Sequence, residues 1–115
     1  MPGWRARRRT LGQWVDPRGI VVLIDRACWH GHILAGHPEM PARLNWLAAT
    51  IEAPDAIYES SYAPTRHCFY RRGVIPEFST LLVKVVVEMY GARAAEVRTA
   101  HLVKSVTLGE VQLWP

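Results

Sequence analysis

The first regular pattern in the chain is a short apolar run, which is followed by residues typical of the start of a helix. The β-branched run Ile20–Ile24 predicts a strand. Asp25 follows it as a good helix N-cap, and Gly36 offers a C-cap after Ala35. We therefore predict a first short helix between Asp25 and Gly36.

A second helix is predicted from about Pro38 to Pro54, because proline suits the first turn of a helix and stops a helix that runs into it. Its apolar stripe consists of Met40, Leu44, Leu47, Ala48 and Ile51, which recur at helical spacing. The rest of the chain predicts strands separated by loops that contain glycine or proline. These strands are Ala56–Ser60, Arg66–Arg72, Leu81–Glu88, Val97–Ser105 and Val111–Trp114.

Helices that come first and strands that follow are typical of an α+β domain. We therefore expect two N-terminal helices packed on one face of a roughly four-stranded antiparallel sheet. Side chains alternate between the two faces of a strand. This alternation places on the helix-covered face the apolar residues Val83, Val85, Val87, Ala100 and Leu102. The opposite face then collects Lys84, Thr99 and His101, with either Tyr70 and Arg66 or His67 and Arg71. Such a face suits a phosphate, or it is the ordinary solvated face of an antiparallel sheet.

The composition is that of one globular domain, with 115 residues, 50% of them hydrophobic and 21% charged. The apolar runs are too short to cross a bilayer, and no apolar segment follows Arg9, so we expect neither a membrane span nor a secretory signal. Cys28 and Cys68 lie far apart and form no C-x-x-C pair. This spacing favours reduced thiols and a cytoplasmic location.

The basic charge is concentrated at the N-terminus. Residues 1–18 contain five arginines and one aspartate (5 − 1 = +4), whereas the other 97 residues contain nine basic and nine acidic side chains. We assign residues 1–18 to a basic, flexible leader and residues 19–115 to a single domain. The leader arginines Arg5, Arg7, Arg8 and Arg9 either bind nucleic-acid phosphates or form a solvated tail. Arg71 and Arg72 are the domain's further nucleic-acid-binding candidates, with a solvated hairpin as the alternative.

Three of the five histidines, His30, His32 and His37, fall within eight positions. A histidine cluster is a proton-transfer site, a metal site or a packed helix end. His30 and His32 diverge by about 200° on a helix, and neither H-E-x-x-H nor a common zinc spacing is present. We therefore predict no metal and no other cofactor. His32 shares a helix face with Trp29, and His37 lies at the mouth of the second predicted helix.

Six segments in a fixed order carry a family resemblance. They are Trp29-x-x-His32-Ile33-Leu34, His37-Pro38-Glu39-Met40, Ile51-x-x-Pro54-Asp55-x-Ile57-Tyr58, Arg66-x-x-Phe69-Tyr70-Arg71, Leu82-Val83-Lys84-Val85-Val86-Val87 and Val97-Arg98-Thr99-Ala100-His101. Over residues 20–105 the chain resembles the phage and mobile-element branch of the barnase–EndoU–colicin–RelE-like nucleases. The resemblance implies helices packed on a four-stranded antiparallel sheet and a metal-independent ribonuclease of toxin or phage-effector type. Many relatives have tyrosine where this chain has His101.

Such a ribonuclease needs a base for the RNA 2′-OH, an acid for the leaving 5′-oxygen, and cations that stabilise the charge on the phosphate. The candidate catalytic residues are His32, His37 and His101 for proton transfer, Arg66 and Lys84 for the phosphate, and Tyr70 and Thr99 as hydrogen-bond donors. The expected partners are an RNA substrate and a cognate antitoxin or immunity protein. The alternative is a non-catalytic module on the same fold that binds nucleic acid or protein.

Overall fold

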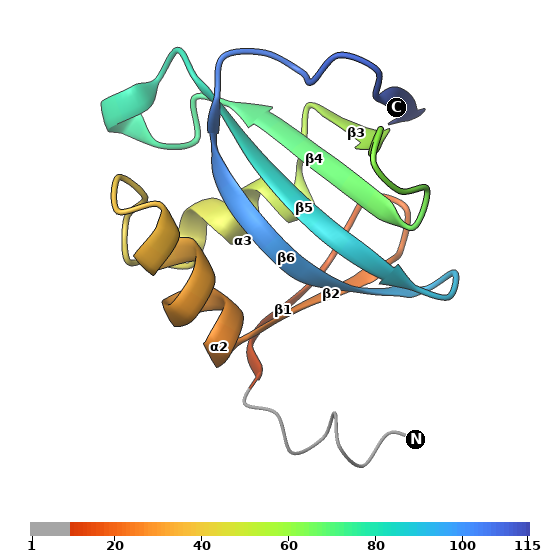
Figure 1. Cartoon of the computed structure of the whole chain (residues 1–115), viewed down its shortest axis with the longest axis horizontal. Coiled ribbons are helices and arrows are strands. Elements are labelled where there is room, and N and C mark those ends of the chain that lie inside the picture. The colour runs from red at the N-terminus through yellow and green to blue at the C-terminus, as the bar shows by residue number, and fades with distance from the viewer. Residues whose placement is uncertain (1–9) are drawn as a thin grey trace.

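The computed structural model describes residues 10–115, which form one seven-stranded sheet with short helical segments (Figure 1). The strands are β1 (Thr10–Val15), β2 (Val21–Asp25), β3 (Ala56–Glu59), β4 (Arg66–Arg72), β5 (Leu82–Tyr90), β6 (Ala94–Val103) and β7 (Val111–Trp114). The helical segments are α2 (Arg26–Cys28), the π-helix η1 (Trp29–Leu34), α3 (Asn45–Glu52) and the 3₁₀ turn η2 (Pro76–Phe78). None of the helices in this part of the chain has the length and hydropathy needed to cross a membrane.

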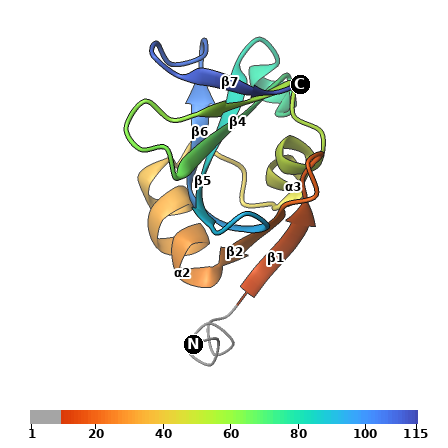
Figure 2. The same cartoon turned by 90° about the vertical axis from the view of Figure 1, so that its right-hand side faces the viewer.

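The sheet is mixed, with the strand order β1-β2-β6-β5-β4-β3-β7. β2 and β6 are parallel, through the short pairing of residues 21–23 with residues 94–96, and the other neighbouring strands are antiparallel. Figure 2 shows that the sheet curls around α3. The expected fold, two N-terminal helices on a four-stranded antiparallel sheet, is therefore wrong. The described chain is mostly β, and three further strands extend the antiparallel set formed by β3, β4, β5 and β6.

The first predicted helix lies at its expected bounds, with residues 26–36 helical, whereas the second is shorter than its sequence pattern indicates. Asp25 does cap the first, because its Oδ1 accepts a hydrogen bond of 2.7 Å from the backbone N–H of Cys28. The helix then changes from α to π bonding at Trp29. The second helix begins at Asn45 rather than Pro38, and residues 37–44 form turns. The residue before each of the two prolines in that segment is disfavoured in the helical conformation, which works against a regular helix there.

Residues 10–18, which the sequence pattern assigns to the leader, form β1 and the start of the turn that joins it to β2. The carboxylate of Asp16 is buried in this turn and accepts hydrogen bonds from the backbone N–H groups of Arg18 (2.8 Å) and Ile20 (3.0 Å). The turn between β1 and β2 is therefore held by one buried acceptor, the Asp16 carboxylate. The leader candidates Arg5, Arg7, Arg8 and Arg9 lie outside the described residues.

The core lies between α3, η1 and the face of the sheet turned toward α3, which we call the core face. α3 contributes Trp46, Leu47 and Ile51, and Trp46 lies 5.7 Å from Trp29 of η1, measured between ring centroids. The strands contribute the residues predicted by alternation, with Val83, Val85, Val87 and Ala100 fully buried and Leu102 packed against them. The opposite face of β3, β4, β5 and β6, which we call the outer face, carries the polar side chains.

Arg18 links the first turn to β4 across the core face. Its guanidinium pairs with the buried Asp16 carboxylate at 2.9 Å, lies 5.7 Å from the centre of the Phe69 ring, and approaches Nδ1 of His67 at 3.0 Å. Burial lowers the pKa of His67, and the Arg18 charge lowers it further. The neutral imidazole is therefore the form that accepts the bond from Arg18.

Asp16→Ala removes the acceptor of two backbone N–H groups and leaves Arg18 without its carboxylate. We expect the free energy of unfolding to fall by about 3–5 kcal/mol, the range for removal of one partner from a buried ion pair. Chemical denaturation measures this loss. Asp16→Asn keeps an oxygen acceptor and should lose less, and the exposed control Glu52→Ala should change stability by less than about 0.5 kcal/mol. A loss no larger than that of the control would contradict the role given to Asp16.

The lowered pKa of His67 predicts a pH-dependent stability. Between its native pKa and the ordinary histidine pKa of 6.5, the unfolded chain binds more protons than the native chain, so stability rises with pH in this window and is complete above it. Acidification from about pH 7 to about pH 5 should therefore destabilise the protein. Denaturation midpoints across this range should fall less steeply in His67→Gln, whose side chain does not titrate. Equal slopes in the two proteins would refute the assignment.

Candidate functional site

An open groove of about 640 Å³ lies at the outer face, between the first helical segment and the strands. Its lining residues are Asp25, Ala27, Cys28, His32, Arg66, Val86, Glu96, Val97, Arg98 and Thr99. Three predicted catalytic residues, His32, Arg66 and Thr99, therefore meet at one place although they come from η1, β4 and β6. The groove exists because α2 and η1 lie alongside β6 beyond the short β2–β6 pairing (Figure 1).

A β-bulge in β6 shapes the groove wall. Val86 pairs with Thr99 and Val87 pairs with Val97, so Arg98 is an extra residue without a partner position on β5. A bulge of this kind turns a side chain out of the regular alternation, and Arg98 is exposed and lines the groove. The thiol of Cys28 lies 3.2 Å from the carbonyl oxygen of Val97 and 3.4 Å from that of Arg98, which joins α2 to the bulge.

The groove holds charges of both signs. Arg66 donates from Nε to Oε1 of Glu88 at 3.0 Å, and hydrogen bonds from Thr65 and Arg66 lower the pKa of this carboxyl. The two terminal nitrogens of an arginine carry four further N–H donors, which suit the oxygens of a phosphate. Burial raises the pKa of Cys28 to about 12, so its thiol stays protonated and is not a nucleophile at neutral pH.

His37 and His101 form a pair beside the groove. Their rings are stacked with centroids 5.1 Å apart and an interplanar angle of 19°. His37 is held by a hydrogen bond of 2.8 Å from its backbone N–H to Ile33, and its Nδ1 lies 3.7 Å from the carboxylate of Glu39. His101 follows Thr99 by two residues on β6, so both point to the outer face, about 7 Å apart along the strand.

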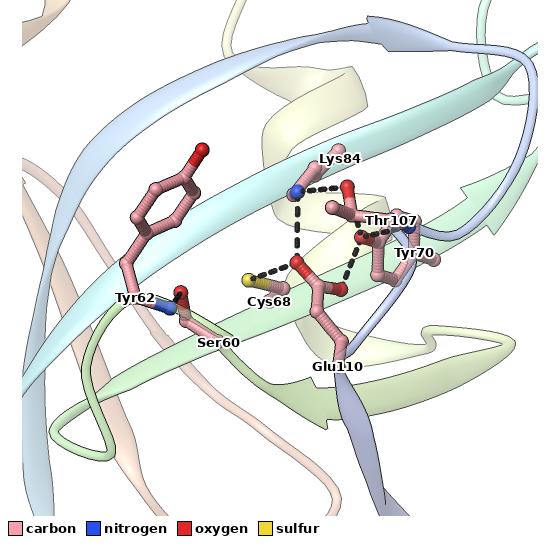
Figure 3. Close-up of polar contacts among 7 residues, drawn as sticks. All are labelled: Ser60, Tyr62, Cys68, Tyr70, Lys84, Thr107 and Glu110. Atoms are coloured by element: carbon pink, nitrogen blue, oxygen red, sulfur yellow. Dashed lines mark hydrogen bonds and ion pairs between the residues drawn. The ribbon is translucent and has the colours of Figure 1, made fainter.

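Tyr70 and Lys84 belong to a buried polar cluster centred on Glu110 (Figure 3). The Tyr70 hydroxyl donates to Oε1 of Glu110 at 2.5 Å, and the Lys84 ammonium donates to Oε2 at 3.0 Å and to the Thr107 hydroxyl at 2.7 Å. The Glu110 side chain is 2% exposed and that of Lys84 is 11% exposed. Both predicted residues are therefore on the outer face but are engaged by Glu110 rather than turned into the groove.

The pKa values in this cluster follow from its contacts. Burial raises the pKa of Tyr70, and its hydrogen bond to Glu110 raises it further. Burial alone lowers the pKa of Lys84, but hydrogen bonds with Glu110 and Tyr70 outweigh that effect and the net shift is upward. The hydroxyl is therefore neutral and the ammonium charged at neutral pH.

The predicted nucleic-acid-binding residues Arg71 and Arg72 do not line the groove. Arg71 points to the core side, where it donates to the backbone carbonyls of Ala49 (3.3 Å) and Ala53 (3.0 Å) at the end of α3. Arg72 donates to the carbonyl oxygen of Thr80. Arg71 stabilises the helix end, since a cation there satisfies carbonyls without intrahelical partners.

Sequence reasoning missed Arg98 and Glu110. Arg98 reaches the groove through a bulge, and an alternation argument that assumes regular pairing cannot place it. Glu110 follows Gly109 in a turn 26 positions after Lys84, with no local pattern that connects the two. No group of three or more His, Cys, Asp or Glu side chains suited to a metal ion occurs among residues 10–115.

Comparisons with protein-family models, with curated proteins and with solved structures find no match to this chain.

The Glu110 cluster predicts strong energetic coupling between Lys84 and Glu110. Glu110→Ala leaves a buried ammonium and hydroxyl without their acceptor, and should lower the free energy of unfolding by about 3–5 kcal/mol. In a Lys84→Met background the same substitution should cost less, with a coupling free energy of about 0.5–3 kcal/mol. A double-mutant cycle by urea denaturation measures the difference. Strictly additive losses would show that the two side chains do not stabilise each other.

Proposed function

We propose that this chain is an endoribonuclease that cleaves RNA without a metal ion, with the scissile phosphate bound in the outer-face groove. The observation that supports the proposal is the convergence of an imidazole, a guanidinium and a hydroxyl, His32, Arg66 and Thr99, on one groove from three separate elements. This set supplies a proton-transfer group, a cation and a hydrogen-bond donor, which are the parts that phosphodiester cleavage requires.

In the proposed reaction the RNA 2′-oxygen attacks the adjacent phosphorus, forming a bond to it as the bond to the 5′-oxygen breaks. A base takes the 2′-OH proton, and an acid gives a proton to the leaving 5′-oxygen. His32 lies in the groove as one of these groups, and the His37–His101 pair beside Thr99 supplies the other. Arg66 and Arg98 bind the phosphate oxygens, and the Thr99 hydroxyl donates to one of them.

The sequence predicts that Lys84 and Tyr70 contact the phosphate, but in this proposal they do not. Glu110 forms an ion pair with the Lys84 ammonium and accepts a hydrogen bond from the Tyr70 hydroxyl, so neither side chain binds the phosphate. The groove also contains the carboxylates of Asp25 and Glu96. We therefore expect modest RNA affinity from the described domain, with cleavage depending on local geometry rather than on a basic surface. A cytoplasmic location and a cognate antitoxin or immunity protein are further parts of the proposal.

The test incubates the purified full chain with several RNAs in EDTA. We expect cleavage that leaves a 2′,3′-cyclic phosphate and stops when the scissile nucleotide is 2′-deoxy. His32→Ala should slow cleavage by about 10²- to 10⁴-fold, the range for one acid–base group. Arg66→Ala should slow it by about 10²- to 10³-fold, the range for one group that stabilises transition-state charge.

Matched controls come from the same chain. His30→Ala changes an exposed histidine of η1 that does not line the groove, and Arg43→Ala changes an exposed arginine before α3. Both should cleave at the wild-type rate. Intact RNA across all substrates would refute the proposal. RNA that is bound but not cleaved would instead support the non-catalytic module, which the mixed charges of the groove favour as the second candidate.

A further inference from the structure

Lys84 has two neighbours that bear on protonation, the Glu110 carboxylate, to which its ammonium donates, and His101, its cross-strand partner. Lys84 is the cross-strand partner of His101 on the pair β5–β6, so both side chains stand on the outer face. Directly opposed residues on one face of an antiparallel pair have Cβ atoms about 5 Å apart. Glu110 and Thr107 accept hydrogen bonds from the Lys84 ammonium (Figure 3). A charged group of fixed position is therefore held next to a histidine of the proposed site.

We infer that Lys84 is a positioning residue: its ammonium, which Glu110 holds in place, is the charge that keeps the neighbouring His101 neutral, and the Glu110 carboxylate offsets part of that charge. The catalytic meaning of this arrangement rests on the proposed function, whereas the neutral state of His101 does not. The inference has three supports, which are the geometry of the stack, the environment of each ring, and the fixed charge of Lys84.

The rings of His37 and His101 are stacked with centroids 5.1 Å apart, so a positive charge on His37 disfavours a positive charge on His101. The rings differ in the nearest charges: Glu39 lies 3.7 Å from Nδ1 of His37, whereas Lys84 is the cross-strand neighbour of His101. The positive neighbour disfavours protonation of His101.

The surroundings of His101 also favour its neutral form. Its Nδ1 is buried and has no hydrogen-bond partner among residues 10–115. An imidazolium donates from both ring nitrogens, so a protonated His101 would bury an unsatisfied charged donor there. Burial lowers the pKa of His101, and the charges of His37 and Lys84 lower it further, against an opposing effect of Glu39. These three side chains are the charged and titratable groups that act on it, from the segment after η1 and from β5.

Lys84 stays charged at the pH values near 6.5 at which a histidine changes its protonation state. Its ammonium donates to a carboxylate and a hydroxyl, and these bonds raise its pKa from the ordinary value of 10.5. Even without Glu110, the lysine would have to lose about four pKa units before it became neutral near pH 6.5. Removal of Glu110 therefore leaves a positive charge beside His101, and removal of Lys84 takes that charge away.

This reasoning predicts shifts of opposite sign for two neighbouring substitutions. The measurement is an NMR titration of the histidine rings in the full chain, with the signals assigned from His37→Gln and His101→Gln. Lys84→Met should raise the His101 midpoint by about half a pH unit, and Glu110→Gln should lower it by a similar amount.

Two further variants separate electrostatics from structural damage. Lys84→Arg keeps the charge and should leave the His101 midpoint closer to the wild-type value than Lys84→Met does. Thr107→Val removes a hydrogen bond of Lys84 but no charge, and should leave the midpoint unchanged. If Glu110→Gln does not fold, the contrast between Lys84→Met and Lys84→Arg still decides the question. Shifts of the same sign for Lys84→Met and Glu110→Gln, or no upward shift for Lys84→Met, would overturn the inference.

Cleavage supplies the functional readout. If the proposed function is correct, the acidic limb of the pH profile for RNA cleavage should move up in Lys84→Met and down in Glu110→Gln, together with the His101 midpoint. If no RNA is cleaved, the proposed function fails while the titration still tests the role of Lys84. If RNA is cleaved but the pH profile does not move with the His101 midpoint, a catalytic role for the His37–His101 stack is contradicted.

Discussion

The architecture depends on the short parallel pairing between β2 and β6. Only three residues of β2 pair with β6, and β6 continues for seven residues beyond them. The chain leaves β2 at Asp25, which caps the first helix, so α2 and η1 run beside the rest of β6. His32 thereby lines the same groove as Thr99, and the His37 ring stacks on that of His101. A longer parallel pairing would have covered this edge with a strand, and the groove would not exist.

The patterns that predicted structure correctly are those that depend on near neighbours. The Asp25 cap is correct because a side-chain oxygen and an N–H three residues later are brought together by the helix itself. The division of faces is correct for Val83, Val85 and Val87 on one side and Lys84 on the other, because alternation follows from strand geometry. Proximity of His32, Arg66 and Thr99 followed from combining such local assignments with the family resemblance.

The features that sequence reasoning could not reach depend on distant partners. β1 belongs to the segment that the N-terminal charge assigns to the leader, and only its pairing with β2 and the buried Asp16 explain its order. The parallel β2–β6 pair joins segments about 70 residues apart, and no local pattern announces it. The positive charge of Arg71 predicts a nucleic-acid contact, yet its guanidinium donates to a carbonyl at the end of α3. The position of this helix end depends on the packing of the whole core. Glu110 acts on residues of β4 and β5 from a turn near the C-terminus.

The burial of Lys84 with Glu110 requires an explanation other than stability. A well-packed pair of hydrophobic residues often stabilises a core as much as a buried ion pair, because desolvation of the two charges offsets their attraction. The outer face around the cluster already contains apolar neighbours such as Val86 and Val103, so an apolar replacement would fit the same environment. What an apolar pair cannot supply is a fixed positive charge one strand away from His101. The cluster is therefore better understood as a device that sets the protonation of its neighbours than as a contribution to the core.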